Sequence, residues 1–257
     1  MNIYRYLIIL LIITVSICGF SQLKLPINNK GVIVGEVLNY KAKWGFITVG
    51  TASEMVDRKL YKSGPSVCYK IQLTGETNGM AKLFYLHDRW TSFIDVNTIT
   101  TYKAFRSIRE GNYRLDEMTY FDRTNKTAKV LVLDKQRKVF VLKKNYKTPE
   151  NIRDVVAGFM LIRLIDLSKY EVGDVFTIEG FYFDEGYRIN VVFEGKECVN
   201  TDKGKILCYR VKPLVPKNHV FDDVDAVDVW LSANKVQSII YARVKLILGN
   251  LIIESEK

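Results

Sequence analysis

A two-residue alternation of apolar and polar side chains recurs along most of the chain, and it constrains the fold more than any other feature. The clearest runs are residues 38–44, 67–74, 187–194, 207–212 and 240–248. Successive side chains of a β-strand point to opposite faces of a sheet, so each run predicts a strand with one buried face. About a dozen such runs, separated by turn residues, predict a mainly β fold in which antiparallel strands form an open or half-closed β-barrel.

One segment departs from this period. Between residues 148 and 168, apolar side chains recur every three or four positions, among them Val156, Phe159 and Ile162. Thr148-Pro149-Glu150 offers an N-cap, a favoured first helical residue and an acid in the first turn. We therefore expect one main α-helix over residues 148–168, and its nearly all-round apolar surface predicts that it packs on the concave face of the sheet. A shorter helical turn is expected over residues 78–86.

Residues 1–21 have the pattern of a secretory signal peptide. Arg5 precedes an apolar stretch at residues 7–17, and the small residues Gly19 and Ser21 stand where a signal peptidase requires them. The apolar stretch is shorter than the roughly 20 residues of a membrane-spanning helix. We therefore expect a cleaved signal peptide, followed by a single β-rich domain over residues 22–257.

Two other fates of this segment are open. It could be retained as a membrane anchor, or it could be processed at Cys18 as a lipoprotein signal, although Ile17 is larger than the residue that usually precedes a lipoprotein cysteine. Either way the chain is expected to leave the cytoplasm, for the periplasm or another envelope compartment.

The charge of the chain narrows the range of partners. There are 38 Lys and Arg against 28 Asp and Glu, and 48% of residues are hydrophobic, a composition that excludes disordered and collagen-like proteins. Nucleic acid is not an expected partner of an exported protein, whereas an anionic membrane surface, glycan or ligand is. The densest basic cluster surrounds an expected hairpin and comprises Lys135, Arg137, Lys138, Lys143, Lys144 and Lys147. It either contacts an anionic envelope surface or only protects an exposed sheet edge from aggregation.

The sequence contains no local motif for catalysis, metal binding or cofactor binding. It lacks a Gly-x-Ser-x-Gly elbow, a His-Glu-x-x-His helix, a Cys-x-x-Cys pair and a phosphate-binding loop. His87 and His219 have no nucleophile or ligand set beside them, and the acidic run over residues 222–228 lacks the glycine and terminal glutamate of a regular calcium loop. We therefore assign no catalytic residue, no metal site and no cofactor.

Cys198 and Cys208 are the candidates for a disulfide. They flank residues 200–205, whose composition predicts a hairpin turn, and a turn centred on Lys203 would place the two cysteines opposite each other. The other interpretation is that both are small buried side chains without a bond, because cross-strand geometry is restrictive for a disulfide.

Aromatic residues are abundant at strand spacing, where they usually form core. A curved sheet can also use them to line an apolar cavity. For such a cavity we select Trp44, Trp90 and Phe159 as apolar contacts, and Arg163 as the residue that would meet a charged group of a ligand if it faces inward.

Several blocks of the sequence, in the same order, resemble the domain of unknown function 3108 family of exported bacterial proteins. The blocks are residues 35–40, 44–52, 154–163, 172–178, 194–213 and 230–234. The resemblance extends over nearly the whole chain after residue 21. It implies an exported protein without an established activity, similar in outline to open β-barrels with a helical lid, the shape of envelope lipoprotein carriers and related lipid-binding proteins.

Together these features favour a non-enzymatic envelope protein that holds an apolar or glycolipid-like ligand between sheet and helix. Two alternatives are open. The protein could be a structural or assembly module that binds envelope partners, or it could be a carboxylate-based glycan hydrolase, a class that leaves no local sequence signature.

We predict that residues 1–21 are removed on export, because the apolar stretch is short and small residues precede Gln22. Intact-mass analysis of the exported protein measures this directly. A mass that includes residues 7–17 would indicate an anchor, and a lipid adduct on an N-terminal Cys18 would indicate lipoprotein processing.

Overall fold

The computed structural model describes residues 31–64, 66–78, 85–182, 185–202, 204–215, 223–246 and 249–256. The expected signal peptide lies outside these ranges, as does most of the helical turn expected over residues 78–86.

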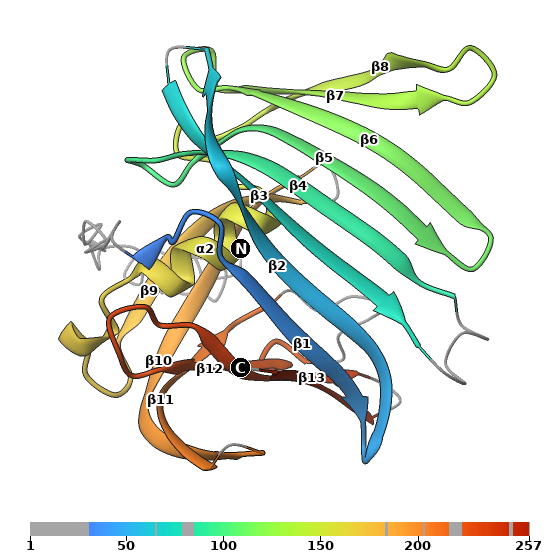
Figure 1. Ribbon diagram of the computed structural model, residues 1–257. Helices are drawn as coiled ribbons and strands as arrows, with labels where there is room; N and C mark the ends of the chain where they lie inside the picture. The colour runs from blue at the N-terminus through green and yellow to red at the C-terminus, as the bar shows by residue number, and fades with distance from the viewer. Residues whose placement is uncertain are drawn as a thin grey trace, which may run out of the picture.

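The described residues form one antiparallel sheet of fourteen strands that curls into an open barrel (Figure 1). In chain order the strands are β1 (Val37–Trp44), β2 (Ile47–Ser63), β3 (Ser66–Thr77), β4 (His87–Asp95), β5 (Thr101–Glu110), β6 (Tyr113–Asp122), β7 (Thr127–Asp134), β8 (Val139–Lys147), β9 (Val175–Tyr182), β10 (Glu185–Thr201), β11 (Gly204–Pro213), β12 (Val227–Ser232), β13 (Ile239–Leu246) and β14 (Gly249–Ser255). The α-helix α2 (Val155–Leu164) and the short 3-10 helix η3 (Leu167–Lys169) connect β8 to β9.

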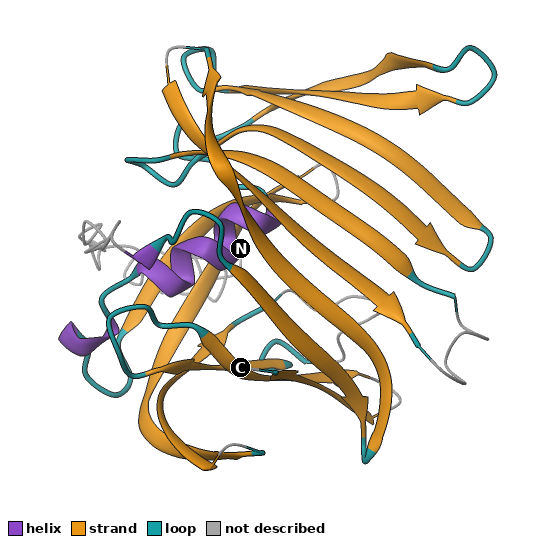
Figure 2. Ribbon diagram, in the orientation of Figure 1, coloured by secondary structure: helices purple, strands orange, loops and turns teal. Residues whose placement is uncertain are grey.

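Strand order follows chain order, with one exception. Neighbours in sequence pair with each other except β8 and β9, which form the two borders of the sheet, and β1 pairs with β14, so the two ends of the domain meet in the middle of the sheet. The helix α2 lies on the concave side (Figure 2). This confirms the predicted mainly β, open antiparallel barrel with one main helix on its concave face, with fourteen strands where about a dozen were expected.

The two-residue alternation decides which side chains face the helix. Val56 of β2 pairs with Ile71 of β3, and both are fully buried in the cluster that contains α2. Their neighbours Met55 and Gln72 point to the outer face and keep part of their surface exposed. The alternation in the sequence therefore predicts the two faces of these strands. It is wrong in β13, where a bulge places Ile240 in the outer cluster with Trp230 while Ala242 packs against the main core.

The turns of this meander fall on two opposite edges of the sheet. We call the edge with the turns at residues 45–46, 111–112 and 135–138 the open edge; these turns lie on the right of Figure 1. The opposite edge, here the helix edge, carries α2. There the Nε2 atom of Gln237, in the connection between β12 and β13, donates to the backbone oxygens of Arg163 and Ile165 at 2.9 and 2.5 Å. The helix therefore covers one end of the barrel, and no helix in the described ranges covers the other.

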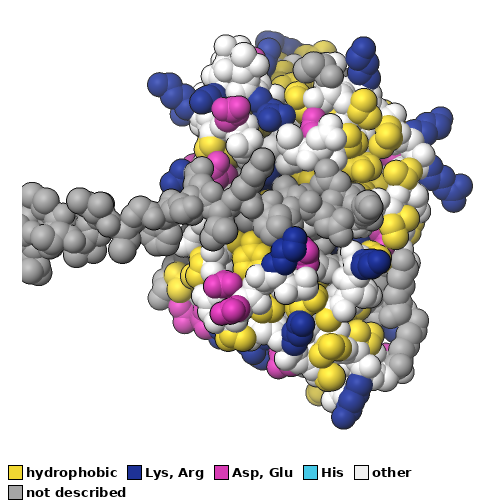
Figure 3. All heavy atoms as spheres, turned by 90° about the vertical axis from the view of Figure 1, so that its left-hand side faces the viewer, with side chains coloured by type: hydrophobic (Ala, Val, Ile, Leu, Met, Phe, Trp, Pro, Cys, Tyr) yellow, Lys and Arg dark blue, Asp and Glu magenta, His cyan; other side chains and the backbone are white. Residues whose placement is uncertain are grey.

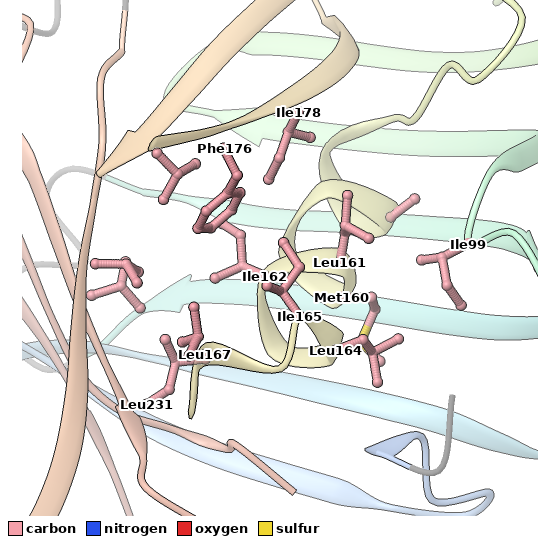
Figure 4. Close-up of a cluster of buried hydrophobic side chains, with 14 of the residues drawn as sticks. Ile99, Met160, Leu161, Ile162, Leu164, Ile165, Leu167, Phe176, Ile178 and Leu231 are labelled. Atoms are coloured by element: carbon pink, nitrogen blue, oxygen red, sulfur yellow. The ribbon is translucent and has the colours of Figure 1, made fainter. Parts of the chain in front are cut away.

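The main hydrophobic core lies between α2 and both halves of the sheet. Figure 4 shows Met160 and Leu164 near Ile99 on one side of the helix, and Ile162 near Phe176 on the other. These side chains are at most 7% exposed. Burial on both sides makes α2 a permanent part of the fold, since each such aliphatic side chain contributes about 1.5–3 kcal/mol when fully buried.

A second, smaller core closes the seam between the two borders of the sheet. The ring of Phe181 in β9 contacts Phe121 in β6 and Tyr146 in β8, with ring centroids 5.5 and 5.6 Å apart. Backbone bonds also cross the seam, because Thr101 N donates to Ile152 O at 3.2 Å and Phe181 N donates to Arg153 O at 2.6 Å. The barrel is thus closed here by side chains and by an extended segment of chain, without direct pairing of β8 and β9.

The helix begins later than the sequence predicts. It starts after Asp154, whose side chain accepts the backbone N–H of Ala157 at 3.2 Å, and the expected cap at Thr148-Pro149-Glu150 is wrong. The backbone oxygens of Ile152 and Arg153, just before Asp154, accept bonds from β5 and β9, as described above, and these tertiary bonds hold the segment extended. Helix α2 ends at Leu164, where the sequence predicted Ser168.

The two cysteines proposed for a disulfide lie on opposite faces of the hairpin. Thr201 pairs with Gly204, so the turn has two residues and Cys198 lies opposite Leu207, while Cys208 lies opposite Glu197. A shift of one residue sends a strand side chain to the other face, which excludes the bond. Both are free thiols, Cys198 exposed and Cys208 buried, where burial raises the pKa of Cys208 to about 11. The absence of a bond agrees with the second interpretation, but only Cys208 is buried as that interpretation expected.

No helix in the described ranges has the length and hydrophobicity that crossing a membrane requires.

We predict that Asp154 makes stability depend on pH in an unusual direction. Burial raises the pKa of this fully buried carboxyl above its ordinary value near 4, despite hydrogen bonds from Ser92 and Thr101 that favour the ionised form. The folded state then binds the proton more tightly than the unfolded state, so this contribution is present at acid pH and is lost as pH rises through the raised pKa.

Asp154→Asn should remove that pH dependence, so its stability relative to the wild type should increase as pH rises through the raised pKa of Asp154. Asp154→Ala should cost about 1–3 kcal/mol, because it leaves the N–H of Ala157 and two hydroxyls without their acceptor. Urea unfolding over a pH series measures both. A constant difference between wild type and Asp154→Asn would contradict the assignment.

Candidate functional site

A small pocket opens on the inner face of the barrel, beside the N-terminus of α2. Its volume is about 30 Å³, enough for one or two water molecules or a small apolar group. It is lined by Trp90, Ala104, Phe105, Arg106, Glu117, Thr119, Phe121, Asp154, Val155 and Phe181. The pocket therefore lies where the helix, the seam and strands β4 to β6 meet.

Strand pairing builds the polar side of this pocket. Trp90 of β4 pairs with Arg106 of β5, which in turn pairs with Glu117 of β6, so the three side chains form a row on the inner face. The Nε atom of Arg106 lies 2.8 Å from Glu117 Oε1, and its guanidinium carbon lies 5.8 Å from the centre of the Trp90 ring. Lys143 of β8 approaches the other oxygen of Glu117 at 3.5 Å. The row gives the pocket a charged wall next to an aromatic one.

Helix α2 supplies the apolar side. Val155 lines the pocket, and Phe159 lies four residues further on the same helix face. Phe159 is 40% exposed, while Val156, Met160 and Leu161 on the other faces are at most 1% exposed. The helix thus has one unburied apolar stripe, and that stripe is directed to the inner face of the barrel.

The predicted ligand contacts fall at different places along this inner face. Trp90 and Phe159 lie near the helix end. Trp44, the last residue of β1, shares the inner face with Ala42 but lies at the open edge, about 25 Å along the strand from Glu36. Trp44 contacts the β14 backbone, since a Cβ on Gly249 would lie 3.3 Å from its ring. The structure therefore groups two of the three aromatic candidates and places the third at the far end of the same face.

Arg163 is not available to a ligand, which corrects the role predicted for it. Its side chain has no exposed surface, its Nη2 atom donates to Glu36 at 2.9 Å, and its Nη1 atom donates to Glu54. Burial alone would lower the pKa of Arg163, but Glu54 and Glu36 together raise it. Burial, followed by the charge of Glu54, also raises the pKa of neighbouring Tyr40. Arg163 is an internal ion-pair partner that fixes α2 to β1 and β2.

Sequence reasoning missed the charged row of Arg106 and Glu117 and the aromatic pair of Phe121 and Phe181. The available signal was weak: Arg106 occupies an inward position of an alternating strand, where an apolar residue is expected. Only the register between β5 and β6 places Glu117 beside it.

A second hollow, of about 410 Å³, lies on the outer face over β1 to β4. It is lined by Asn39, Thr51, Ala52, Ser53, Gln72, Thr74, Glu76, His87, Arg89 and Glu256. Many of these polar groups bond to one another; for example, His87 Nδ1 lies 3.3 Å from Glu76 Oε2. His219, the other histidine, lies outside the described residues.

Acidic residues near the C-terminal half bind cations of the protein itself. Asp228 accepts hydrogen bonds from Arg210 and Arg243, at 2.8 and 2.7 Å, and Lys212 and Lys245 flank Asp225. Among the described residues, no group of three or more His, Cys, Asp or Glu is placed to hold a metal ion.

The basic cluster lies on the β7–β8 hairpin. Lys135, Arg137 and Lys138 form its turn on the open edge, and Lys143 and Lys144 follow on the border strand β8. All five side chains are exposed.

Comparison with known proteins gives the family. The model of a family described as "Protein of unknown function (DUF3108)" matches residues 39–254. The chain belongs to the DUF3108 family. This confirms the resemblance found in the sequence blocks. The fold of this DUF3108 protein is also similar to the crystal structure of a β-barrel-like protein of domain of unknown function DUF1849 from Brucella abortus. The TM-score is 0.48 at 8% sequence identity, over 86% of this chain and 94% of that chain. Among curated proteins, none matches the sequence.

We predict that removing the charge of Arg163 destabilises this DUF3108 protein strongly. Arg163→Met leaves Glu36 and Glu54 buried without a cation and should cost about 3–5 kcal/mol at neutral pH. The unpaired glutamates would then have raised pKa values, so the stability of the variant should recover at acid pH and fall again as pH rises above about 4.

Urea unfolding at several pH values checks this. Adding Glu36→Gln and Glu54→Gln to Arg163→Met removes the unpaired charges and should restore much of the lost stability. A single variant within about 1 kcal/mol of the wild type at neutral pH would show that the ion cluster does not secure the helix.

Proposed function

We propose that the protein is a non-enzymatic envelope protein that binds an elongated apolar ligand, such as an acyl chain, along the inner face of the barrel. The observation that carries this proposal is the exposure of Phe159. A helix buried on its other faces leaves a large aromatic side chain 40% exposed, on the same face as the pocket-lining Val155. Burying such a side chain against a ligand is favourable by about 1.5–3 kcal/mol when burial is complete.

The rest of the inner face supports an extended ligand. Ala42 pairs with Ile253, which pairs with Ala242, so the three form an apolar row on the inner face beyond α2. All three are only half-buried, as is Leu73 of β3. The pocket at about 30 Å³ is too small to enclose a lipid, whose binding requires a few hundred Å³. The ligand would therefore lie along the open concave surface, from Phe159 towards Trp44.

A structural or assembly module is the second candidate. The packing of Met160, Leu161 and Ile162 beneath the helix favours it, because most of the apolar surface of α2 is already satisfied by the protein. In that case the exposed stripe of Phe159 would serve a protein partner or no partner.

The geometry offers little for a glycan hydrolase. Asp88 and Glu110 lie together on the inner face, and burial, followed by the neighbouring Asp88, raises the pKa of Glu110. Their side chains are joined by a hydrogen bond. Glycosidase carboxyl pairs stand about 5–9.5 Å apart, so that a sugar or a water fits between them. The two carboxyls here are too close for that role.

Export to the periplasm or another envelope compartment is part of the proposal. Its support is the signal-peptide pattern of residues 1–21.

The proposal predicts that Phe159 matters more for ligand retention than for stability. Phe159→Ala should reduce the lipid that copurifies with protein isolated from the envelope, while its free energy of unfolding falls by less than the about 3–5 kcal/mol of a fully packed Phe. The measurements are mass spectrometry of extracted lipid and urea unfolding of delipidated protein.

Tyr120→Ala is the matched control. Tyr120 is 43% exposed, close to the value for Phe159, but it lies on the outer face of β6. Its removal should leave lipid retention unchanged. The absence of lipid from wild-type protein, or equal retention by both variants, would reject ligand binding and favour the structural module.

A further inference from the structure

The turn between β1 and β2 presents an aromatic side chain almost entirely to solvent. Trp44 pairs with Ile47, so the turn contains only Gly45 and Phe46. Gly45 has φ +61°, in the left-handed region that glycine adopts without strain, and the tight turn projects Phe46 away from the sheet. Phe46 is 95% exposed and Ile47 is 56% exposed.

Other turns of the open edge share this character. Tyr113 begins β6 with 56% of its surface exposed, and Val139 begins β8 with 51% exposed. Figure 1 shows these turns along the same side of the molecule as the β1–β2 turn, away from α2. Single exposed apolar residues are common on protein surfaces, but apolar residues on three tips of one edge indicate a contact surface.

Cations accompany the apolar tips. Arg114 follows Tyr113 and stacks over the ring of Tyr85 at 5.3 Å. The β7–β8 turn adds Lys135, Arg137 and Lys138, all exposed. Asp134, which precedes them in sequence, lies 3.6 Å from the guanidinium of Arg137. The helix edge, which faces the viewer in Figure 3, carries both acidic and basic side chains.

We propose that the open edge docks on an anionic membrane surface, with Phe46 inserted at the boundary between headgroups and acyl chains. Aromatic side chains prefer this boundary, and cations near an anionic surface add about fivefold each to the affinity. The β7–β8 turn contacts the anionic headgroups. Docking in this orientation places the open edge of the barrel against the membrane and keeps α2, at the helix edge, away from it.

This orientation gives the proposed apolar ligand a direct route between the bilayer and the inner face. Membrane docking and ligand binding nevertheless depend on different residues. The docking residues lie on the open edge, whereas Phe159 lies at the other end of the barrel. Phe159→Ala should therefore bind vesicles like the wild type, and the two proposals can fail separately.

The test is flotation of the exported protein with lipid vesicles. The intact mass of the sample should first establish that residues 7–17 are absent, because that apolar stretch would bind vesicles by itself. We expect binding to vesicles of phosphatidylcholine with about one-third phosphatidylglycerol, and much weaker binding to phosphatidylcholine alone. Phe46→Ser should weaken binding by about tenfold, and Phe46→Trp should preserve it.

Two triple charge-reversal variants distinguish docking through the open edge from a general attraction between the basic protein and the anionic membrane. The variant Lys135→Glu, Arg137→Glu, Lys138→Glu changes the open edge. The control Lys126→Glu, Lys169→Glu, Lys235→Glu makes the same change in net charge at exposed positions of the helix edge. Only the first should abolish binding at physiological salt.

Equal losses from the two triple variants would reject an oriented surface in favour of net charge alone. An unchanged affinity of Phe46→Ser would reject insertion of the tip. Absence of vesicle binding, together with a dimer in solution that Phe46→Ser disrupts, would assign the open edge to a second copy of the chain and overturn the proposal. Circular dichroism of each variant verifies that the exposed substitutions leave the fold intact.

Discussion

Arg163 holds the helix against the middle of the sheet, and the other features of the interior follow from that contact. Its partners are Glu36, which immediately precedes β1, and Glu54 in the centre of β2, close to where the first and last strands of the domain pair. A buried cation is stable only beside groups that neutralise its charge, here the two glutamates. The ion cluster therefore fixes the position of α2 along the barrel and the rotation of the helix about its own axis. With that rotation fixed, Met160 and Leu161 enter the core, and Phe159 is left on the inner, unburied side.

The parts of the fold that depend on local pattern could be predicted from the sequence. Strand faces follow from a period of two, and the pairs Val56–Ile71 and Ala42–Ile253 lie on the inner face as their alternation requires. The helix itself was predictable from its period, but its first residue was not. Residues before Asp154 are held extended by backbone bonds to β5 and β9, and such bonds between distant segments leave no trace in local composition.

The candidate site was less predictable, for the same physical reason. Glu54 lies 109 residues from Arg163 in sequence and Glu36 lies 127 residues away, so an arginine on an apolar helix looks like a ligand contact until its partners are known. The prediction for the cysteine pair depended on the length of one turn. The turn has one residue fewer than expected, and this difference places Cys198 on the opposite face of the hairpin from Cys208. Trp90 and Phe159 lie near the pocket because their strand and helix positions are both set by periodicity.

The seam between β8 and β9 means that strand pairing alone does not set the circumference of this barrel. In a fully hydrogen-bonded barrel, the number of strands and their stagger fix the diameter. Here the last contact is made by the rings of Phe121, Tyr146 and Phe181, together with the extended segment before α2. That segment accepts backbone bonds from Thr101 and Phe181, so the separation of β8 and β9 is set by the rings and by the inserted segment, and not by a continuous ladder between the two strands. The pocket beside Phe181 lies in this seam, so its volume depends on the distance between the two border strands of the sheet.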